Sequence, residues 1–162
     1  MAQGKYLYLM RHGEAAPGAV DFERTLTHRG RKQIAVQAAQ FKLSDGIRPD
    51  GIFCSTAKRT VETVNGLQKL FKGVPVFYRE TLYLAPTHRL LDLIRETDDV
   101  FSRLLIIGHN PGMEQLVSLI DQKGMRVPME TADCVEISLG IKSWGEIKPG
   151  VGKIEKIFRT SI

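Results

Sequence analysis

The fold is decided by the stretch Tyr6-Leu7-Tyr8-Leu9-Met10-Arg11-His12-Gly13-Glu14. Its first five residues form a short apolar run, which is typical of a buried strand. Charged and titratable residues and a glycine follow the run directly. In α/β folds, sites form where loops leave the carboxyl ends of the strands. The sequence therefore predicts a central strand at 6–10 and the start of a site at Arg11.

The rest of the chain alternates between strand-like and helix-like segments. Further short strands are predicted at 52–54, 74–78 and 104–107, and the last of these is the most continuous apolar run. A change of pattern near the C-terminus predicts strands at 135–139 and 153–158 that close the edge of the sheet. The alternation predicts one α/β domain over residues 1–162, with a mostly parallel sheet and helices on both faces.

Helix starts are marked by capping residues and by proline. Ser, Thr and Asn accept hydrogen bonds from the first free N–H groups of a helix, and proline fits its first turn. Four helices are expected on this basis. The first is capped by Thr27 and runs to about Leu43. The second is capped by Ser55 or Thr56 and carries the stripe Val61, Val64, Leu67 and Phe71, and the third has Pro86 in its first turn and carries Leu90, Leu91 and Ile94. The fourth is capped by Asn110 and has Pro111 at its first position.

The amino-acid composition indicates which kinds of binding partner the protein is expected to have. The 162 residues are 43% hydrophobic, which suits one continuous core, and the net charge is +5. The basic residues are dispersed, so a solvated surface is favoured over a nucleic-acid patch. No apolar run approaches a membrane span. Cys54 and Cys134 lie in apolar stretches and are expected to be buried free thiols. A cytoplasmic protein without a nucleic-acid or membrane partner is expected, and the oligomeric state stays open.

Three predicted strand exits carry unusual polar residues: Arg11 and His12, the segment 55–59 with Arg59, and His109. The arginine fork donates paired hydrogen bonds to phosphate oxygens. A neutral imidazole nitrogen attacks phosphorus and holds the phosphoryl group covalently, while nearby positive charges stabilise the transition state. The sequence therefore predicts a dianion pocket. No metal or cofactor is expected, because the four histidines lack metal-ligand spacing.

Four segments, in order, resemble the histidine phosphatase superfamily, which includes the phosphoglycerate mutases. They are the RHG segment Leu9–Glu14, the LTxxG segment Leu26–Gly30, the SxxxRxxxT segment Cys54–Thr63 and the second-histidine segment Ile106–Gly112. The resemblance covers residues from about 6 to 120 and implies a phosphoglycerate mutase-like fold. It also implies that His12 becomes phosphorylated, and that Arg11, Arg59 and His109 bind the phosphoryl group.

The resemblance is less specific about the other site residues. Glu80 follows the third strand, where one branch of the family keeps an acidic residue, so it is the candidate proton donor; a surface glutamate is the alternative. Arg24 either adds charge to the pocket or is a solvated loop arginine. Glu14 is expected to be structural. Asn110 is a candidate substrate-binding residue and occupies the place of the acidic donor of the phytase branch. Gly18 stands where mutases usually carry Asn. These departures fit neither branch.

Loop length points to one subgroup. Only 28 residues separate Glu80 from His109, which leaves no room for the helical cap of mutases and phytases. An open pocket suits a phosphoryl group displayed on a macromolecule. The segments 82–86 and 108–112 resemble the SixA-type phosphohistidine phosphatases. This implies a phosphohistidine protein as substrate. The alternatives are a small phosphate ester, such as a sugar phosphate, and a non-catalytic phosphoprotein-binding module.

Overall fold

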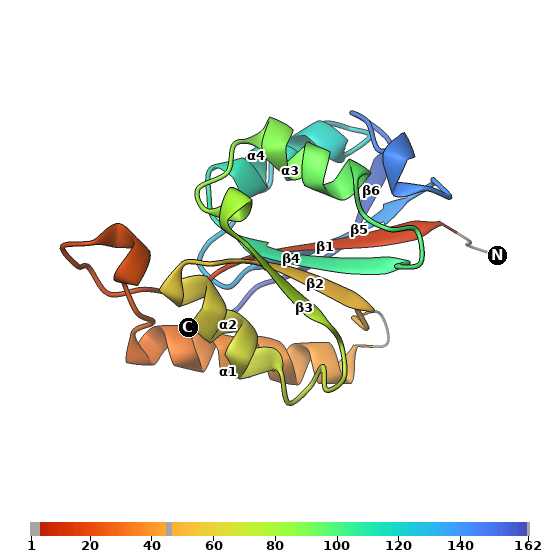
Figure 1. The fold of residues 1–162 in the computed structure, drawn as a ribbon. Coiled ribbons are helices and arrows are strands. Elements are labelled where there is room, and N and C mark those ends of the chain that lie inside the picture. The colour runs from red at the N-terminus through yellow and green to blue at the C-terminus, as the bar shows by residue number, and fades with distance from the viewer. Residues whose placement is uncertain (1–3, 45–46, 162) are drawn as a thin grey trace.

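The computed structural model describes residues 4–44 and 47–161. Six strands form one sheet in the order β3-β2-β4-β1-β5-β6 (Figure 1). The first four strands in the chain run parallel, β5 is antiparallel to β1, and β6 is antiparallel to β5. This confirms the mostly parallel sheet with an added edge. The strands are β1 (Lys5–Arg11), β2 (Gly51–Ser55), β3 (Val76–Arg79), β4 (Arg103–Gly108), β5 (Cys134–Leu139) and β6 (Gly152–Phe158).

Helices cover both faces of the sheet, as predicted (Figure 1). The helices α1 (His28–Leu43) and α2 (Lys58–Leu67) lie on one face, and α3 (Thr87–Arg95) and α4 (Gly112–Ile120) lie on the other. Short 3-10 turns are present at η1 (Asp21–Glu23), η2 (Glu80–Leu82) and η3 (Trp144–Glu146).

The apolar residues of β1 contribute side chains to two hydrophobic cores, one on each face of the sheet. Leu7 and Leu9 belong to the hydrophobic cluster that includes residues of α3 and α4. Tyr8 and Met10 belong to the cluster on the side of α1 and α2. Successive side chains of a strand point to opposite faces, so a strand covered on both sides needs apolar residues at every position. Both cysteines are buried and free, as expected.

Some predicted boundaries were wrong. Thr27 caps α1 as expected, and its hydroxyl accepts a hydrogen bond from the Gly30 N–H at 2.9 Å. Neither Ser55 nor Thr56 caps α2, whose N-cap is Ala57, because Ser55 ends β2. The predicted stripe also overran the helix, which ends at Leu67.

Two further elements begin later than predicted. The fourth helix begins at Gly112 with Pro111 as its N-cap; Asn110 Oδ1 instead accepts from the Glu114 N–H at 3.3 Å. Strand β3 begins at Val76 rather than at residue 74.

The interval between Glu80 and His109 holds η2, α3 and β4. It contains a single α-helix, which packs on the sheet, so the structure agrees with the predicted absence of a helical cap. Within residues 4–44 and 47–161, no helix is long and apolar enough to span a membrane.

Candidate active site

The carboxyl ends of β1, β2 and β4 meet at one edge of the sheet and bring the predicted residues together. Arg11 pairs with Gly108 in the parallel register, and the His12 N–H donates to the Gly108 carbonyl at 3.2 Å. The rings of His12 and His109 lie 5.3 Å apart, centroid to centroid. A pocket of about 270 Å³ opens here, lined by Arg11, His12, Asp21, Arg24, Arg59, His109, Asn110 and their neighbours.

His12 is arranged as a nucleophile. Its Nδ1 lies 2.7 Å from the Gly13 carbonyl oxygen, which can only accept, so Nδ1 carries the proton and Nε2 keeps its lone pair. Nε2 faces the Nε–H of Arg59 at 3.3 Å. The pKa of His12 is lowered to about 4, mainly by burial; the Gly13 hydrogen bond opposes this shift, and the charges of Arg59 and Arg11 add to it. The imidazole is therefore neutral at neutral pH.

Arg59 presents one edge of its guanidinium to both histidines. It lies in the first turn of α2 and is 2% exposed. Nε faces Nε2 of His12, and Nη2 faces Nδ1 of His109, each at 3.3 Å. A phosphoryl group placed between the rings would meet two parallel N–H donors, which is the geometry that guanidinium offers to phosphate.

His109 is held by Ser55. The Nε2 of His109 lies 2.7 Å from Oγ of Ser55, while Nδ1 faces Arg59. Arg59 can only donate, so Nδ1 accepts and Nε2–H donates to the hydroxyl. The pKa of His109 is lowered to about 3, mainly by burial, with contributions from His12 and Arg59. Ser55, which was considered as a helix cap, thus fixes the tautomer of the second histidine.

Arg11 supplies an unused donor. Its Nη1 donates to the Met129 carbonyl at 3.1 Å. Its Nε is buried and has no hydrogen-bond partner among the described residues. A buried donor without an acceptor is costly, and this one belongs to a pocket-lining residue. An anion oxygen in the pocket would satisfy it.

Comparison with known proteins agrees with this geometry. A family model described as the histidine phosphatase superfamily, branch 1, matches residues 7–83. The chain is thus similar to the histidine phosphatase superfamily over its N-terminal part. An uncharacterised chloroplastic protein of Arabidopsis thaliana is 28% identical over 167 residues, which cover 92% of this chain and 75% of the relative.

Solved structures share the fold of this chain. A Nakamurella multipartitia protein assigned as a phosphohistidine phosphatase SixA superimposes with a TM-score of 0.84 at 22% identity, covering 98% of this chain and 97% of its own. An Agrobacterium tumefaciens protein with the same assignment gives 0.76 at 25% identity, over 96% and 97%. The protein histidine phosphatase SixA complexed with tungstate gives 0.81 at 18%, also over 96% and 97%.

Two candidate substrate-binding residues line the pocket, but their N–H groups already donate to other protein atoms. Arg24 donates from Nε to the Ala16 carbonyl at 2.8 Å and from Nη1 to Oδ1 of Asp21 at 3.0 Å. Asn110 donates from Nδ2 to the Met129 carbonyl at 2.9 Å. Both residues therefore hold the pocket walls in the structure, and their contact with substrate stays a prediction.

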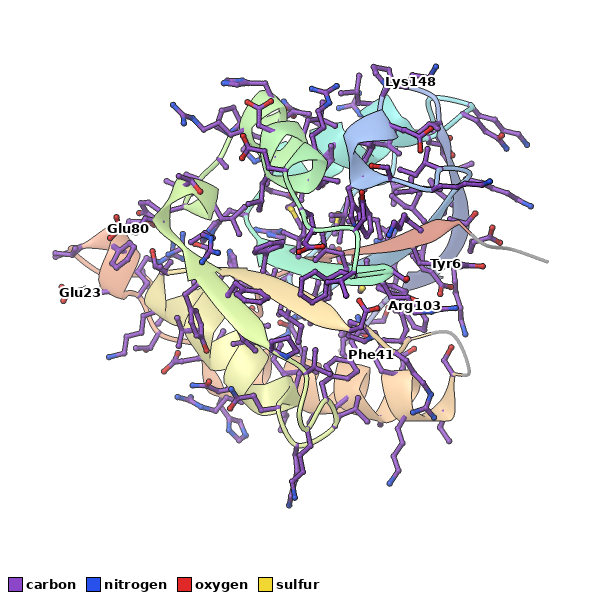
Figure 2. All side chains as sticks on the ribbon, turned by 45° about the vertical axis from the view of Figure 1, so that its right-hand side comes forward. Tyr6, Glu23, Phe41, Glu80, Arg103 and Lys148 are labelled. Atoms are coloured by element: carbon purple, nitrogen blue, oxygen red, sulfur yellow. The ribbon has the colours of Figure 1, made fainter. Side chains whose placement is uncertain are left out.

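Glu80 is not brought to the pocket. It begins η2, its side chain is exposed, and it is absent from the residues that line the cavity. Figure 2 places it at the outer left-hand edge of the view. The predicted role of Glu80 as proton donor therefore gains no geometric support from the described contacts.

Asp21 is the pocket residue that sequence reasoning missed. Its carboxylate accepts hydrogen bonds from the Tyr83 hydroxyl, from Arg24 and from Arg59. The Tyr83 hydroxyl, followed by Arg24, holds the pKa of Asp21 far below its usual range, so the group is ionised. The only signal in the sequence was its spacing, three residues before Arg24, in a loop without periodicity.

No group of three or more His, Cys, Asp or Glu side chains in the described part of the chain could hold a metal ion. The polar groups that line the pocket are instead three guanidinium groups, two neutral imidazoles and the carboxylates of Glu14 and Asp21. This arrangement can bind a phosphoryl dianion and accept it covalently on His12.

Proposed function

We propose that this protein is a histidine phosphatase that removes phosphate from phosphohistidine in proteins by way of a phosphorylated His12. The observation that carries the proposal is the neutral Nε2 of His12, which faces the Arg59 Nε–H at 3.3 Å inside an uncapped pocket.

Transfer takes two steps. In the first, the Nε2 lone pair of His12 attacks phosphorus, and the bond from phosphorus to the substrate imidazole nitrogen breaks as that ring is protonated. The Nε and Nη2 hydrogens of Arg59, and Nε–H of Arg11, stabilise the phosphoryl oxygens. In the second step, water attacks phosphorus, inorganic phosphate leaves, and the Nε2 lone pair is restored.

The two carboxylates of the pocket are ionised, and this favours an imidazole over an alkoxide as the leaving group. Glu14 accepts from the Thr27 hydroxyl at 2.7 Å and from Arg29 at 2.6 Å, and these two contacts lower its pKa. Asp21 is ionised as well. An ionised carboxylate cannot donate a proton. A protonated imidazole leaves with little help, whereas an alkoxide depends on a general acid.

The open mouth of the pocket supports a macromolecular substrate. Leu84 lines the pocket and is 52% exposed, and Val20 on the neighbouring loop is 53% exposed. No helical insertion between Glu80 and His109 covers this side. The relatives named SixA, which share the fold over nearly the whole chain, also support a phosphohistidine substrate.

A substrate panel tests the proposal. Initial rates are measured for a phosphohistidine protein, a phosphoserine peptide and a sugar phosphate. We expect the highest kcat/KM for the phosphohistidine protein. If the protein barely acts on phosphohistidine but hydrolyses the sugar phosphate well, the substrate assignment fails. The open pocket admits small esters, so that outcome would favour a phosphomonoester phosphatase.

A further inference from the structure

We infer that Asp21 is a positioning residue that directs the phosphate-binding edge of Arg59 into the pocket. This inference rests on the proposed function, in which Arg59 stabilises the phosphoryl group during its transfer to His12.

The guanidinium of Arg59 has two edges, and they face different partners. The edge formed by Nε and Nη2 faces the two histidines, at 3.3 Å each. The edge formed by Nη1 and Nη2 faces Asp21: Nη1 donates to its main-chain oxygen at 2.8 Å, and Nη2 donates to Oδ2 at 3.1 Å. Each Nη carries two hydrogens. Asp21 therefore holds Arg59 from behind without competing for the hydrogens that face the pocket.

Asp21 is also the charge partner of Arg59. The side chain of Arg59 is 3% exposed and that of Asp21 is 45% exposed. Among the ion pairs of the described residues, this is the one that Arg59 makes. A buried guanidinium is stable only when its donors and its charge are matched. The half-exposed carboxylate of Asp21 gives Arg59 both a hydrogen-bond acceptor and a balancing negative charge.

Two neighbours fix Asp21 in turn. Arg24 donates to Oδ1 at 3.0 Å, and the Tyr83 hydroxyl donates to Oδ2. The ring of Phe22 packs edge-on against Tyr83, with the centroids 5.0 Å apart. These contacts tie η1, which carries Asp21, to the segment that follows η2. The direction of the Arg59 fork thus depends on a loop far from it in sequence.

Removal of the carboxylate should let the fork turn away from the histidines. Misplacement of a catalytic group by about 1 Å can cost on the order of a hundredfold in rate. The interactions lost are those with the transition state, so the loss should fall on kcat more than on KM. If Asp21 had a purely structural role, its replacement would lower the stability of the protein without lowering kcat more than it changes KM.

The test is a double-mutant cycle. Asp21→Asn, which keeps the size of the side chain, is made in the wild type and in Arg59→Lys, and kcat and KM are measured with an aryl phosphate. Vanadate affinity, which needs no turnover, is measured for the same four proteins. Glu23→Gln removes the same charge from the same 3-10 turn and serves as the matched control.

We expect Asp21→Asn to lower kcat about tenfold to a hundredfold, with KM changed less than about threefold. Vanadate should bind about tenfold more weakly. In the Arg59→Lys background both effects should shrink below about threefold, because the fork is already absent. Glu23→Gln should behave as wild type.

Equal losses in the two backgrounds, or an equal loss in Glu23→Gln, would overturn the inference. If Asp21→Asn does not fold, Tyr83→Phe, which removes one partner of the carboxylate, takes its place in the cycle under the same criterion. A wild type that binds vanadate but never hydrolyses phosphohistidine would instead contradict the proposed function, and the vanadate cycle would still decide the role of Asp21.

Discussion

The imidazole of His109 lies 2.7 Å from the hydroxyl of Ser55 and is oriented by it. The proton sits on Nε2, and Nδ1 faces Arg59. A bound dianion beside this ring would favour its charged form and would raise the pKa of His109. His109 can then take up a proton on Nδ1 and donate it to a phosphoryl oxygen. Ser55 makes this possible because it holds Nε2–H away from the pocket.

Ser55→Ala should therefore cost both stability and activity. The buried Nε2–H of His109 would lose its acceptor, which costs about 1–3 kcal/mol in free energy of unfolding. Chemical denaturation measures this loss. Thr56→Val is the matched control, because Oγ1 of Thr56 is buried without a hydrogen-bond partner in the described structure. It should be neutral or stabilising. Equal destabilisation by the two changes would contradict the role of Ser55.

Arg59→Lys should impair catalysis although it keeps the charge. Lysine lacks the planar fork that faces His12 and His109. We expect kcat/KM to fall about tenfold to a thousandfold, which corresponds to about 1.4–4 kcal/mol. Arg79→Lys, at an exposed position on β3, should leave kcat/KM unchanged. Wild-type kinetics in Arg59→Lys would mean that the pocket has been misassigned.

Stability should fall as the pH is lowered from about 6.5 to about 4. Burial, the main cause, lowers the pKa of His12 to about 4 and that of His109 to about 3, from an unfolded value of 6.5. Between these values the unfolded chain binds more protons than the folded one, so acid favours unfolding. The slope approaches about 1.4 kcal/mol per pH unit for each histidine.

Urea denaturation across this range measures the slope. The double variant His12→Gln, His109→Gln should show a smaller pH dependence than wild type. An unchanged dependence would mean that the two imidazoles are not the groups that titrate.

The sequence was sufficient to predict that Arg11, His12, Arg59 and His109 lie together, because each stands at or shortly after the carboxyl end of a strand. Parallel strands bring their carboxyl ends to one edge, so Arg11, His12 and His109 had to meet once β1 and β4 were identified. Arg59 followed from its position in the first turn after β2.

The sequence did not reveal Asp21 or the role of Ser55. Asp21 contacts Arg59 across 38 residues from a loop with no periodic pattern, and such a contact depends on where the loop packs. Ser55 was predicted as a helix cap on local propensity, but its hydroxyl pairs with His109, which lies 54 residues away. In both cases a tertiary contact overrides or escapes the local signal.

Glu80→Gln distinguishes a donor from a surface residue. If Glu80 is the proton donor, the change should severely impair hydrolysis of alkyl phosphates and spare phosphohistidine and aryl phosphates, whose leaving groups need less protonation. Its exposed position outside the pocket lining favours small, equal losses on all three substrates. Rates of wild type and variant on the three substrates decide between these outcomes, and equal losses would leave His109 or solvent as the proton source.

The covalent intermediate is the most direct test of the proposed mechanism. The protein is exposed briefly to a radiolabelled phosphate ester, quenched, and mapped by peptide analysis. We predict label on His12 that is labile in acid and stable in base, as expected for a phosphoramidate. His88→Ala, at an exposed position on α3, should label like wild type, whereas His12→Ala should not label. Undiminished label in His12→Ala would contradict the assignment of His12 as the nucleophile.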